Sequence, residues 1–456
     1  MSTSRTPARR RAARGPEAGA RGGASEASAL GKNVANSSRT DPGARRADRY
    51  ELRRRLWKLS SLPGVRKCGR VSRTGAGGPT LRVSGGDGQR VAGYAGLVSC
   101  GAMSCPCCAA RIGARRVEEI TQVVDRVHAE GGTVALVTLT ARHHAGHRLA
   151  EVWDAITTGW ARITSGREYA EELQRFGVTG WCAVVETTHG EASWHPHRHA
   201  LVFFDGPISR EMVEALVARQ GNRGRDAGWF ERWRRGLIRA GCPAATDRGR
   251  DHRCRYTGPE RCSSPFEPVE HRGGLDVQIV DRGDGGSLGT YLSKVAHEVS
   301  GLPTKVGRAG SRTPWQLLRD ALENHAEAYD PRDLDLWFEY EQTARRRRTI
   351  TWSQGTRERY EVRVQSDEEI VAEELSGAHD DLIALPAPTW RAIRQESDTL
   401  LTVAEQDGPE GAALWLSRRG LPWSWANASP GRGRPPRALR IAQDRAEARR
   451  VLCPTS

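Results

Sequence analysis

Hydrophobic and polar residues follow two different periods between about residues 57 and 355. Apolar side chains spaced three and four residues apart predict amphipathic helices at 115–127 and 149–164. Apolar, β-branched runs predict strands, which are 133–140, 178–188, 197–204, 275–280 and 349–352. The strands outnumber the long helices and pair as hairpins, so we predict an α+β fold: a central antiparallel sheet flanked by helices.

The two ends of the chain and one internal segment lack this regularity. Residues 1–56 carry many Arg residues and little apolar periodicity, which predicts a disordered basic arm; the alternative is a leader with no role beyond solubility. Residues 222–271, rich in Arg, Gly, Cys and Pro, are interpreted as an insertion. Residues 356–456 are interpreted as a helical and partly disordered region of unknown role.

Composition narrows the class of protein. The 456 residues are 38% hydrophobic, enough to bury a core, which excludes a wholly disordered chain. A net charge of +15, carried mainly by Arg, favours a polyanionic partner, most often nucleic acid. No apolar run approaches the roughly 18–20 residues of a membrane span, and the first residues hold no apolar secretory segment. We therefore expect a cytoplasmic protein with no membrane partner, whose clustered Cys residues bind metal.

A histidine-rich strand is the most informative stretch of the sequence. Alternate side chains of a strand share a face, so His197 and His199 point the same way, with His195 beside them if the strand extends that far. Glu186, among apolar residues of the preceding strand, can reach that face if the two strands are neighbours. Imidazole and carboxylate ligands together suit Mn²⁺ or Mg²⁺ acting on a phosphate, whereas the alternative is a His-rich surface strand. Irregular spacing favours a surface position for three more histidines: His143, His144 and His147.

Cysteines cluster between residues 68 and 108. A C-x-x-C turn, one Cys five residues before it and one some thirty residues upstream supply the four thiolates of a closed structural zinc site. The predicted ligands are Cys68, Cys100, Cys105 and Cys108, with Cys107 as a competing ligand and free core thiols as the alternative. Basic residues flank this predicted zinc knuckle, the segment that holds the four cysteines, which suggests that it contributes to binding duplex DNA. An irregular set in the insertion leaves a second zinc site open: Cys242, His252, Cys254 and Cys262.

A further segment carries a candidate nucleophile. Residues 285–294 follow a strand and open a predicted helix at 289–299, on which Tyr291 and Lys294 share a face. A phenol with its usual pKa of about 10 needs a nearby cation or a metal-polarised phosphate before it attacks. Without the histidine strand, a packing Tyr and a solvated Lys would be the simpler interpretation.

The order of three motifs resembles that of rolling-circle plasmid replication initiators, which belong to the HUH endonuclease superfamily. The motifs are Thr138-Leu139-Thr140, His197-Arg198-His199 and Tyr291-Leu292-Ser293-Lys294, and the resemblance covers roughly residues 60–355 with the cysteine cluster. It implies an HUH-type antiparallel sheet, with the His pair on a central strand and the Tyr on a helix beneath it. It also implies that Tyr291 attacks an origin phosphate, leaving a 5′-phosphotyrosine link and a 3′-OH primer. His197, His199 and Glu186 would hold the divalent ion, and Lys294 would position or neutralise the phosphate.

Two positions depart from the family pattern. Arg198 takes the usually hydrophobic middle position of the His motif, but it faces away from the metal ligands, so we expect little effect. Ser287 stands where some relatives carry a Glu that activates water to end replication. The residue that serves termination stays open among three candidates: Asp281, Asp284 and Glu298.

These interpretations divide the chain into the basic arm at 1–56, a Cys-rich zinc- and DNA-binding segment at 57–128, a nicking and joining domain at 129–355, and the region at 356–456. The predicted function is to nick one strand at a plasmid's double-strand origin and later rejoin the displaced strand. No second Tyr follows Tyr291 within a helical turn, which favours the single-tyrosine class. The expected partners are single- and double-stranded origin DNA, a host helicase and a polymerase. Two alternatives are a non-enzymatic zinc-dependent DNA-binding regulator and an HUH transposase or relaxase.

Overall fold

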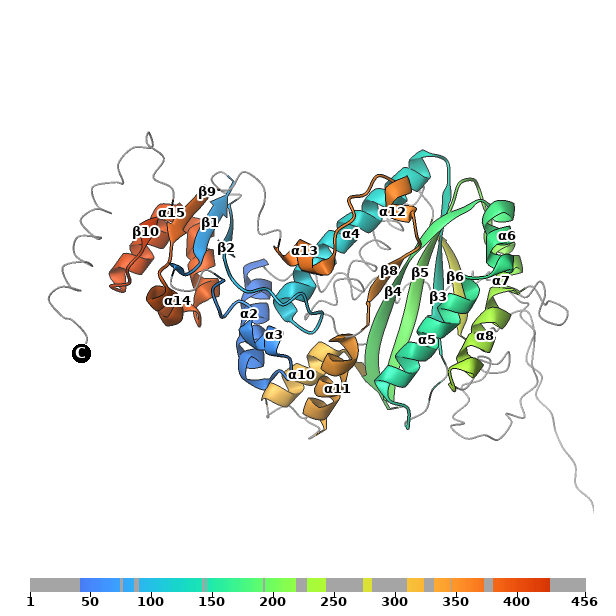
Figure 1. Cartoon of the computed structure of the whole chain (residues 1–456), viewed down its shortest axis with the longest axis horizontal. Coiled ribbons are helices and arrows are strands. Elements are labelled where there is room, and N and C mark those ends of the chain that lie inside the picture. Colours follow the sequence, from blue (N-terminus) through green and yellow to red (C-terminus); the bar gives the residue numbers. More distant parts are fainter. Residues whose placement is uncertain are drawn as a thin grey trace, which may run out of the picture.

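The computed structural model describes residues 42–73, 77–85, 90–141, 143, 146–191, 193–218, 228–242, 274–280, 310–323, 332–345, 347–372 and 380–426. These residues form two antiparallel sheets, each covered by helices, with a helical region between them (Figure 1). The predicted combination of helices with an antiparallel sheet is therefore confirmed. No helix within the described ranges is both long and apolar enough to cross a membrane.

The larger sheet has the strand order β6-β3-β5-β4-β7, and β8 pairs with a different part of β4. All of its pairings are antiparallel. Its strands are β3 (Thr133–Thr140), β4 (Val178–Gly190), β5 (Ser193–Phe204), β6 (Leu275–Val280), β7 (Ser311–Arg312) and β8 (Ile350–Trp352). The hairpin β4–β5 and the strands β3, β6 and β8 were all predicted from their apolar runs. The histidine-rich β5 lies in the centre of the sheet.

Helices lie against both faces of the larger sheet (Figure 1), and the alternating side chains of its strands are buried on both. Val137 and Val202 belong to the core on the α5 side, whereas Leu136 and Leu201 belong to the core on the α4 side. The surrounding helices are α4 (Pro106–Ala129), α5 (Leu149–Ile163), α6 (Arg167–Phe176), α7 (Arg210–Ala218), α8 (Trp229–Arg239) and α12 (Thr356–Arg359). Because both faces are covered, each position of β5 has a fixed side, which decides where its histidines point.

A helical region joins the two sheets around the cysteine cluster. Its core includes Cys68, Cys105 and Cys108 together with Leu56 and Trp337, all buried. It is built from α2 (Pro42–Leu59), α3 (Pro63–Lys67), the start of α4, α10 (Pro314–Glu323), α11 (Asp333–Arg345) and α13 (Asp367–Ala372). α4 extends from this region onto the larger sheet, and its 24 residues make it about 36 Å long.

The smaller sheet unites two parts of the chain that lie far apart in sequence. Its order is β10-β9-β1-β2, from β1 (Thr80–Ser84), β2 (Val91–Ala95), β9 (Asp380–Ala384) and β10 (Ser424–Trp425). Leu81 of β1 pairs with Ile383 of β9, and both are fully buried. Two helices complete the core, α14 (Ala387–Ile393) and α15 (Ser397–Arg418). Strands from the predicted 57–128 segment and the 356–456 region therefore share one sheet.

The predicted disordered arm is wrong at its C-terminal end, because residues 42–56 belong to helix α2. Leu52, Leu56 and Trp57 are buried in the core of the helical region, although their helix is otherwise mostly polar and charged. So few apolar positions give a weak sequence pattern, and tertiary packing stabilises the helix. The rest of the predicted arm, residues 1–41, lies outside the described residues.

The predicted insertion at 222–271 also contains regular structure. Helix α8 buries Trp229, Trp233 and Leu237, which recur every four residues on a helix that is otherwise rich in Arg. Gly159 of α5 permits this packing, since a Cβ there would lie 2.4 Å from the Trp233 ring. The described part of the insertion, residues 228–242, thus contributes to the core of the larger sheet, and residues 222–227 and 243–271 lie outside the described residues.

Candidate functional site

Three potential metal ligands meet on two neighbouring strands of the larger sheet. β4 and β5 pair so that Glu186 lies directly opposite His197. Oε2 of Glu186 lies 3.2 Å from Nε2 of His199 and 3.6 Å from Nε2 of His197. The three side chains offer ligand atoms that all lie within 4.8 Å of one another. The structure therefore brings together the three residues that the sequence predicts as ligands of a divalent ion.

The spacing and the environment of this group fit such an ion. Adjacent ligands held about 2.1 Å from an ion lie roughly 3 Å apart, close to the distances between the Glu186 and His ligand atoms. The side chains of His199, Glu186 and His197 are 8%, 15% and 18% exposed, so the group is partly buried but reachable. Three protein ligands leave coordination positions open, as a site that acts on a substrate requires.

Thr138 on β3 contacts the ring of His199 from the side opposite Glu186. The register of β3 and β5 pairs these two residues, and Oγ1 of Thr138 lies 3.1 Å from Nδ1 of His199. When Nδ1 carries the proton and donates it to the hydroxyl, Nε2 presents its lone pair toward Glu186. The motif Thr138-Leu139-Thr140 thus contributes an orienting contact to the ligand group.

His195 extends the row of histidines and also contacts the ring of His143. The ring centroids of His195 and His197 lie 4.5 Å apart. Nδ1 of His195 lies 2.5 Å from Nε2 of His143. His143 is half-buried, whereas its irregular spacing in the sequence predicts a surface position. Burial lowers the pKa of His195, which favours its neutral form. His143 escaped prediction because its position depends on the path of the loop after β3, which no local periodicity encodes.

Several predicted site residues lie outside the described residues. They are Tyr291, Lys294, Ser287, the termination candidates Asp281, Asp284 and Glu298, and also His144, His252, Cys254 and Cys262. Cys242, the described member of the irregular set, is buried. His147 lies along a separate hollow beside His189 and Glu191. The roles predicted for the residues outside the described ranges stay predictions.

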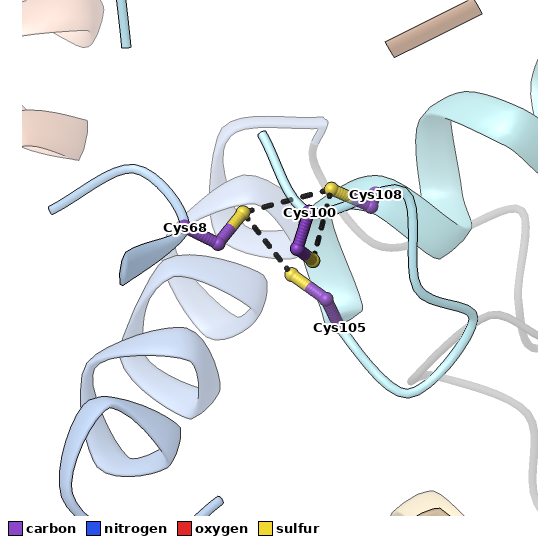
Figure 2. A group of neighbouring side chains, drawn as sticks. All are labelled: Cys68, Cys100, Cys105 and Cys108. Carbon is purple, nitrogen blue, oxygen red and sulfur yellow. Dashed lines mark hydrogen bonds between the residues drawn. The ribbon is translucent and has the colours of Figure 1, made fainter. Parts of the chain in front are cut away.

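Four cysteines converge where α3, the segment before α4 and the first turn of α4 meet (Figure 2). The Sγ atom of Cys68 lies 3.6 Å from those of Cys105 and Cys108, and the Sγ atom of Cys100 lies 3.6 Å from that of Cys108. Thiolates around a tetrahedral zinc at 2.3 Å lie about 3.8 Å apart, so the arrangement fits a zinc ion. The structure brings together the four Cys residues that the sequence predicts as ligands.

Cys107, the competing ligand, points away from this cluster. Its Sγ atom lies 3.7 Å from the backbone oxygen of Arg49 in α2. Burial raises the pKa of the Cys107 thiol, which favours its neutral form. Proline at position 106 begins α4, and the helical turn that follows sends Cys107 and Cys108 in different directions.

Comparison with known proteins finds a matching family model and two similar curated proteins. Residues 94–236, which hold the whole Glu186–His197–His199 group, match a family model described as "Replication protein". A curated relative from Streptomyces lividans, "Protein rep", is 30% identical over 309 residues, which are 58% of this chain and 64% of the relative.

Within these matched parts, the chain is similar to replication proteins.

A second curated relative carries a different name. The "Neomycin resistance protein" of Streptomyces cyanogenus is 33% identical over 168 residues, which are 31% of this chain and 38% of the relative. The chain thus spans less than two thirds of the length of either relative. No solved structure matches the chain. The region that matches the family model includes three of the four clustered cysteines and ends before Tyr291.

Arg198 is buried without a carboxylate partner in the part of the chain that the structure describes. It lies between the two ligand histidines in sequence but on the α5 side of the sheet, with 2% of the residue exposed. Its guanidinium donates to the hydroxyls of Thr157 and Thr351 over 3.2 and 3.3 Å. Burial lowers the pKa of Arg198 to about 10. A hydrophobic residue at this position would avoid the cost of removing the charge from water.

The variant Arg198→Met should therefore be more stable against unfolding than the unaltered protein. We expect the free energy of unfolding to rise by about 1–3 kcal/mol, since an apolar side chain of similar size replaces a desolvated charge. Urea denaturation followed by tryptophan fluorescence measures this change. Arg232→Met is the matched control, because the buried Arg232 pairs with Glu172 and its loss should cost about 3 kcal/mol. Equal destabilisation by both variants would contradict the interpretation.

Proposed function

We propose that this protein initiates plasmid replication by nicking one strand of the origin DNA and later rejoining the displaced strand. The observation that carries the proposal is the Glu186–His197–His199 group on the central strands of the larger sheet. Its donor atoms fit a divalent ion, and the residues lie within the region that matches the family model. The motif order along the chain supplies the nucleophile, Tyr291, in the expected place after the histidine strand.

In the proposed reaction, the phenolic oxygen of Tyr291 forms a bond to phosphorus as the bond between phosphorus and the 3′-oxygen breaks. The phenolic proton passes to solvent, and the released 3′-oxygen takes up a proton to become the 3′-OH primer. The DNA 5′ end stays attached through phosphotyrosine, and attack by a 3′-OH reverses the step and rejoins a strand. Lys294, three residues after Tyr291 in sequence, is proposed to neutralise the phosphate.

The described residues supply the electrostatic part of this reaction. A divalent ion held by Glu186, His197 and His199 would polarise the scissile phosphate and offset charge on its oxygens. Thr138 keeps the ring of His199 in the orientation that presents Nε2 to the group. The low exposure of the three ligands, 8–18%, limits competing water, and their exposed part is where a phosphate would approach.

This function defines the proposed partners and location. Single-stranded origin DNA would bind at Glu186, His197 and His199, which we call the nicking group. Duplex origin DNA would be bound as the first target. Extension of the 3′-OH primer requires a polymerase, and strand displacement requires a helicase, both supplied by the host. The reaction would take place in the cytoplasm, where the plasmid lies.

The direct test is a search for a metal-dependent covalent product. The full chain would be incubated with single-stranded oligonucleotides tiling the DNA around its gene, with Mn²⁺, with Mg²⁺ or with chelator, and resolved on denaturing gels. We expect one tile to give a protein–DNA adduct with metal and none with chelator. Mass spectrometry of the digested adduct should find the nucleotide on the peptide that contains Tyr291. Binding to a tile without cleavage under any metal would contradict the proposal and favour a non-enzymatic regulator.

A further inference from the structure

Six basic residues lie on two segments that meet between the cysteine cluster and the smaller sheet, where Trp390 contacts the backbone of Arg70. We call this group the basic patch, and its members are Arg66, Lys67, Arg70, Arg73, Arg391 and Arg394. The first four come from the end of α3 and the segment after it, which contains the cluster residue Cys68. The last two come from α14 and its C-terminal end. All six are exposed or half-buried, so they can reach a large partner.

Backbone contacts hold the two halves of the basic patch together. The indole nitrogen of Trp390, which is buried in the core of the smaller sheet, donates to the backbone oxygen of Arg70 over 3.0 Å. Residues 69–73 pair with residues 96–98 through three backbone hydrogen bonds of 2.7–2.9 Å. The segment is therefore fixed on one side by Trp390 and on the other by the strand-like run that leads to Cys100. The patch is a preformed surface rather than a set of independent side chains.

The charges of the basic patch are not balanced by carboxylates. None of its six members forms an ion pair within the described part of the chain. Two arginines of the adjacent α2, by contrast, are paired, Arg46 with Glu405 and Arg54 with Asp398. The pKa of Arg394 is lowered by burial and by its neighbours Arg70 and Arg391, which are cations themselves. Gathered, uncompensated cations indicate a surface that meets a polyanion.

We propose that the basic patch binds the phosphate backbone of duplex DNA, at a place separate from the nicking group. This inference rests on the proposed function, because it names the surface that holds the duplex while a single strand reaches Glu186, His197 and His199. α4 begins at the cysteine cluster, beside the patch, and packs Ile120 and Val127 against the larger sheet. Much of a helix about 36 Å long therefore separates the patch from the core that supports the nicking group.

The chemistry of the patch favours DNA over a protein or a membrane surface. Its exposed apolar residue is Val71, 40% exposed, whereas protein interfaces are centred on buried aromatic and apolar anchors. Five of the six cations are Arg, whose planar fork matches a phosphate through two hydrogen bonds. The cysteine cluster would fix this surface, since Cys68 lies between the basic residues Lys67 and Arg70 in sequence.

The test is the salt dependence of duplex binding by the full chain. The double variant Arg391→Gln/Arg394→Gln would be compared with the unaltered protein by fluorescence anisotropy, using a random 30-base-pair duplex between 50 and 300 mM salt. Each lost phosphate contact lowers the slope of log K against log salt by about 0.9, so we expect a fall of about 2. At 0.15 M salt this corresponds to a loss of roughly 10- to 30-fold in affinity. Metal-dependent cleavage of a single-stranded oligonucleotide should change by less than about twofold, because the nicking group is untouched.

A matched control separates the patch from general loss of positive charge. Arg167→Gln/Arg175→Gln removes two arginines from α6 on the larger sheet and should leave the salt slope unchanged. An unchanged slope in the patch variant would overturn the proposal, as would an equal loss in the control. A parallel loss of single-strand cleavage would also overturn it, because the patch would then hold the nicked strand. The slope is measured without metal, so failure of the nicking reaction itself would leave this result readable. A third variant, Arg70→Gln, should lower the slope by about 1 if the patch acts as one surface.

Discussion

Tyr291→Phe should abolish the covalent protein–DNA adduct without changing the affinity of the protein for Mn²⁺. The phenylalanine ring keeps the size of the side chain but lacks the oxygen that would bond to phosphorus. The proposed metal ligands are Glu186, His197 and His199, so metal binding does not depend on Tyr291. Denaturing gels measure the adduct, and titration calorimetry measures the affinity for Mn²⁺. Tyr169→Phe, on α6, is the matched control and should form the adduct normally.

The variant His199→Gln should lose both formation of the covalent adduct and affinity for Mn²⁺. Removing one of three protein ligands, whose Nε2 lies 3.2 Å from Glu186, should weaken Mn²⁺ binding by about 100-fold or more and reduce adduct formation to a similar extent. His189→Gln is the matched control, since His189 also lies in the hairpin but packs against Trp194 on the other side of the sheet. Normal adduct formation in the Tyr291→Phe protein would identify another nucleophile. Unchanged metal affinity in the His199→Gln protein would remove this group as the metal site.

Cys105→Ser should abolish zinc binding by the cysteine cluster, if zinc is its metal as the sequence predicts, and should lower the stability of the protein. Cys105 is fully buried, and its Sγ atom lies 3.6 Å from that of Cys68. A serine hydroxyl is a poor zinc ligand, and the remaining thiolates would be held close together without the ion that offsets their charge. We expect zinc content to fall from about one ion to none, and the free energy of unfolding to fall by at least about 3 kcal/mol. Plasma emission spectrometry and thermal denaturation measure the two quantities.

Cys107→Ser provides an internal control for this change. Cys107 lies two residues from Cys105 and is half-buried, but its Sγ atom faces the backbone of Arg49 instead of the cluster. The variant should retain its zinc and lose less than about 1 kcal/mol of stability. If Cys107→Ser lost zinc and Cys105→Ser did not, the assignment of the four ligands would be wrong.

Local patterns in the sequence predicted the part of the site that depends on strand geometry. The alternation of β5 and a short polar turn were sufficient to place His197 and His199 on one face, with Glu186 opposite. The spacing of the cysteines likewise predicted the set that the structure brings together. The Glu and His residues lie in neighbouring strands, so the periodicity of the chain determines their positions. Cys68 is separated from the other three cysteines by β1 and β2, and the number of thiolates in a closed zinc site predicted it.

Features that depend on distant packing could not be predicted in this way. Helix α2 has few apolar residues among many arginines, and only the surrounding core explains why Leu56 is buried. The pairing of β1 with β9 joins segments about 300 residues apart, and no local pattern indicates such a partner. His143 follows β3 and contacts His195 of β5, and no local periodicity predicts this contact. The roles of Tyr291 and Lys294 stay predictions from the motif order.

The order of the strands in the smaller sheet also determines when this sheet can form during synthesis on the ribosome. β1 and β2 leave the ribosome roughly 300 residues before β9, which at about 5–20 residues per second means a wait on the order of 15 to 60 s. During that interval one edge of β1 lacks its partner strand, and unpaired edges promote association between nascent chains. The strands β3, β4 and β5 emerge much closer together, so the histidine strand can pair well before the smaller sheet closes. Slow translation of the middle of the gene would therefore prolong the period in which this protein is most prone to aggregate.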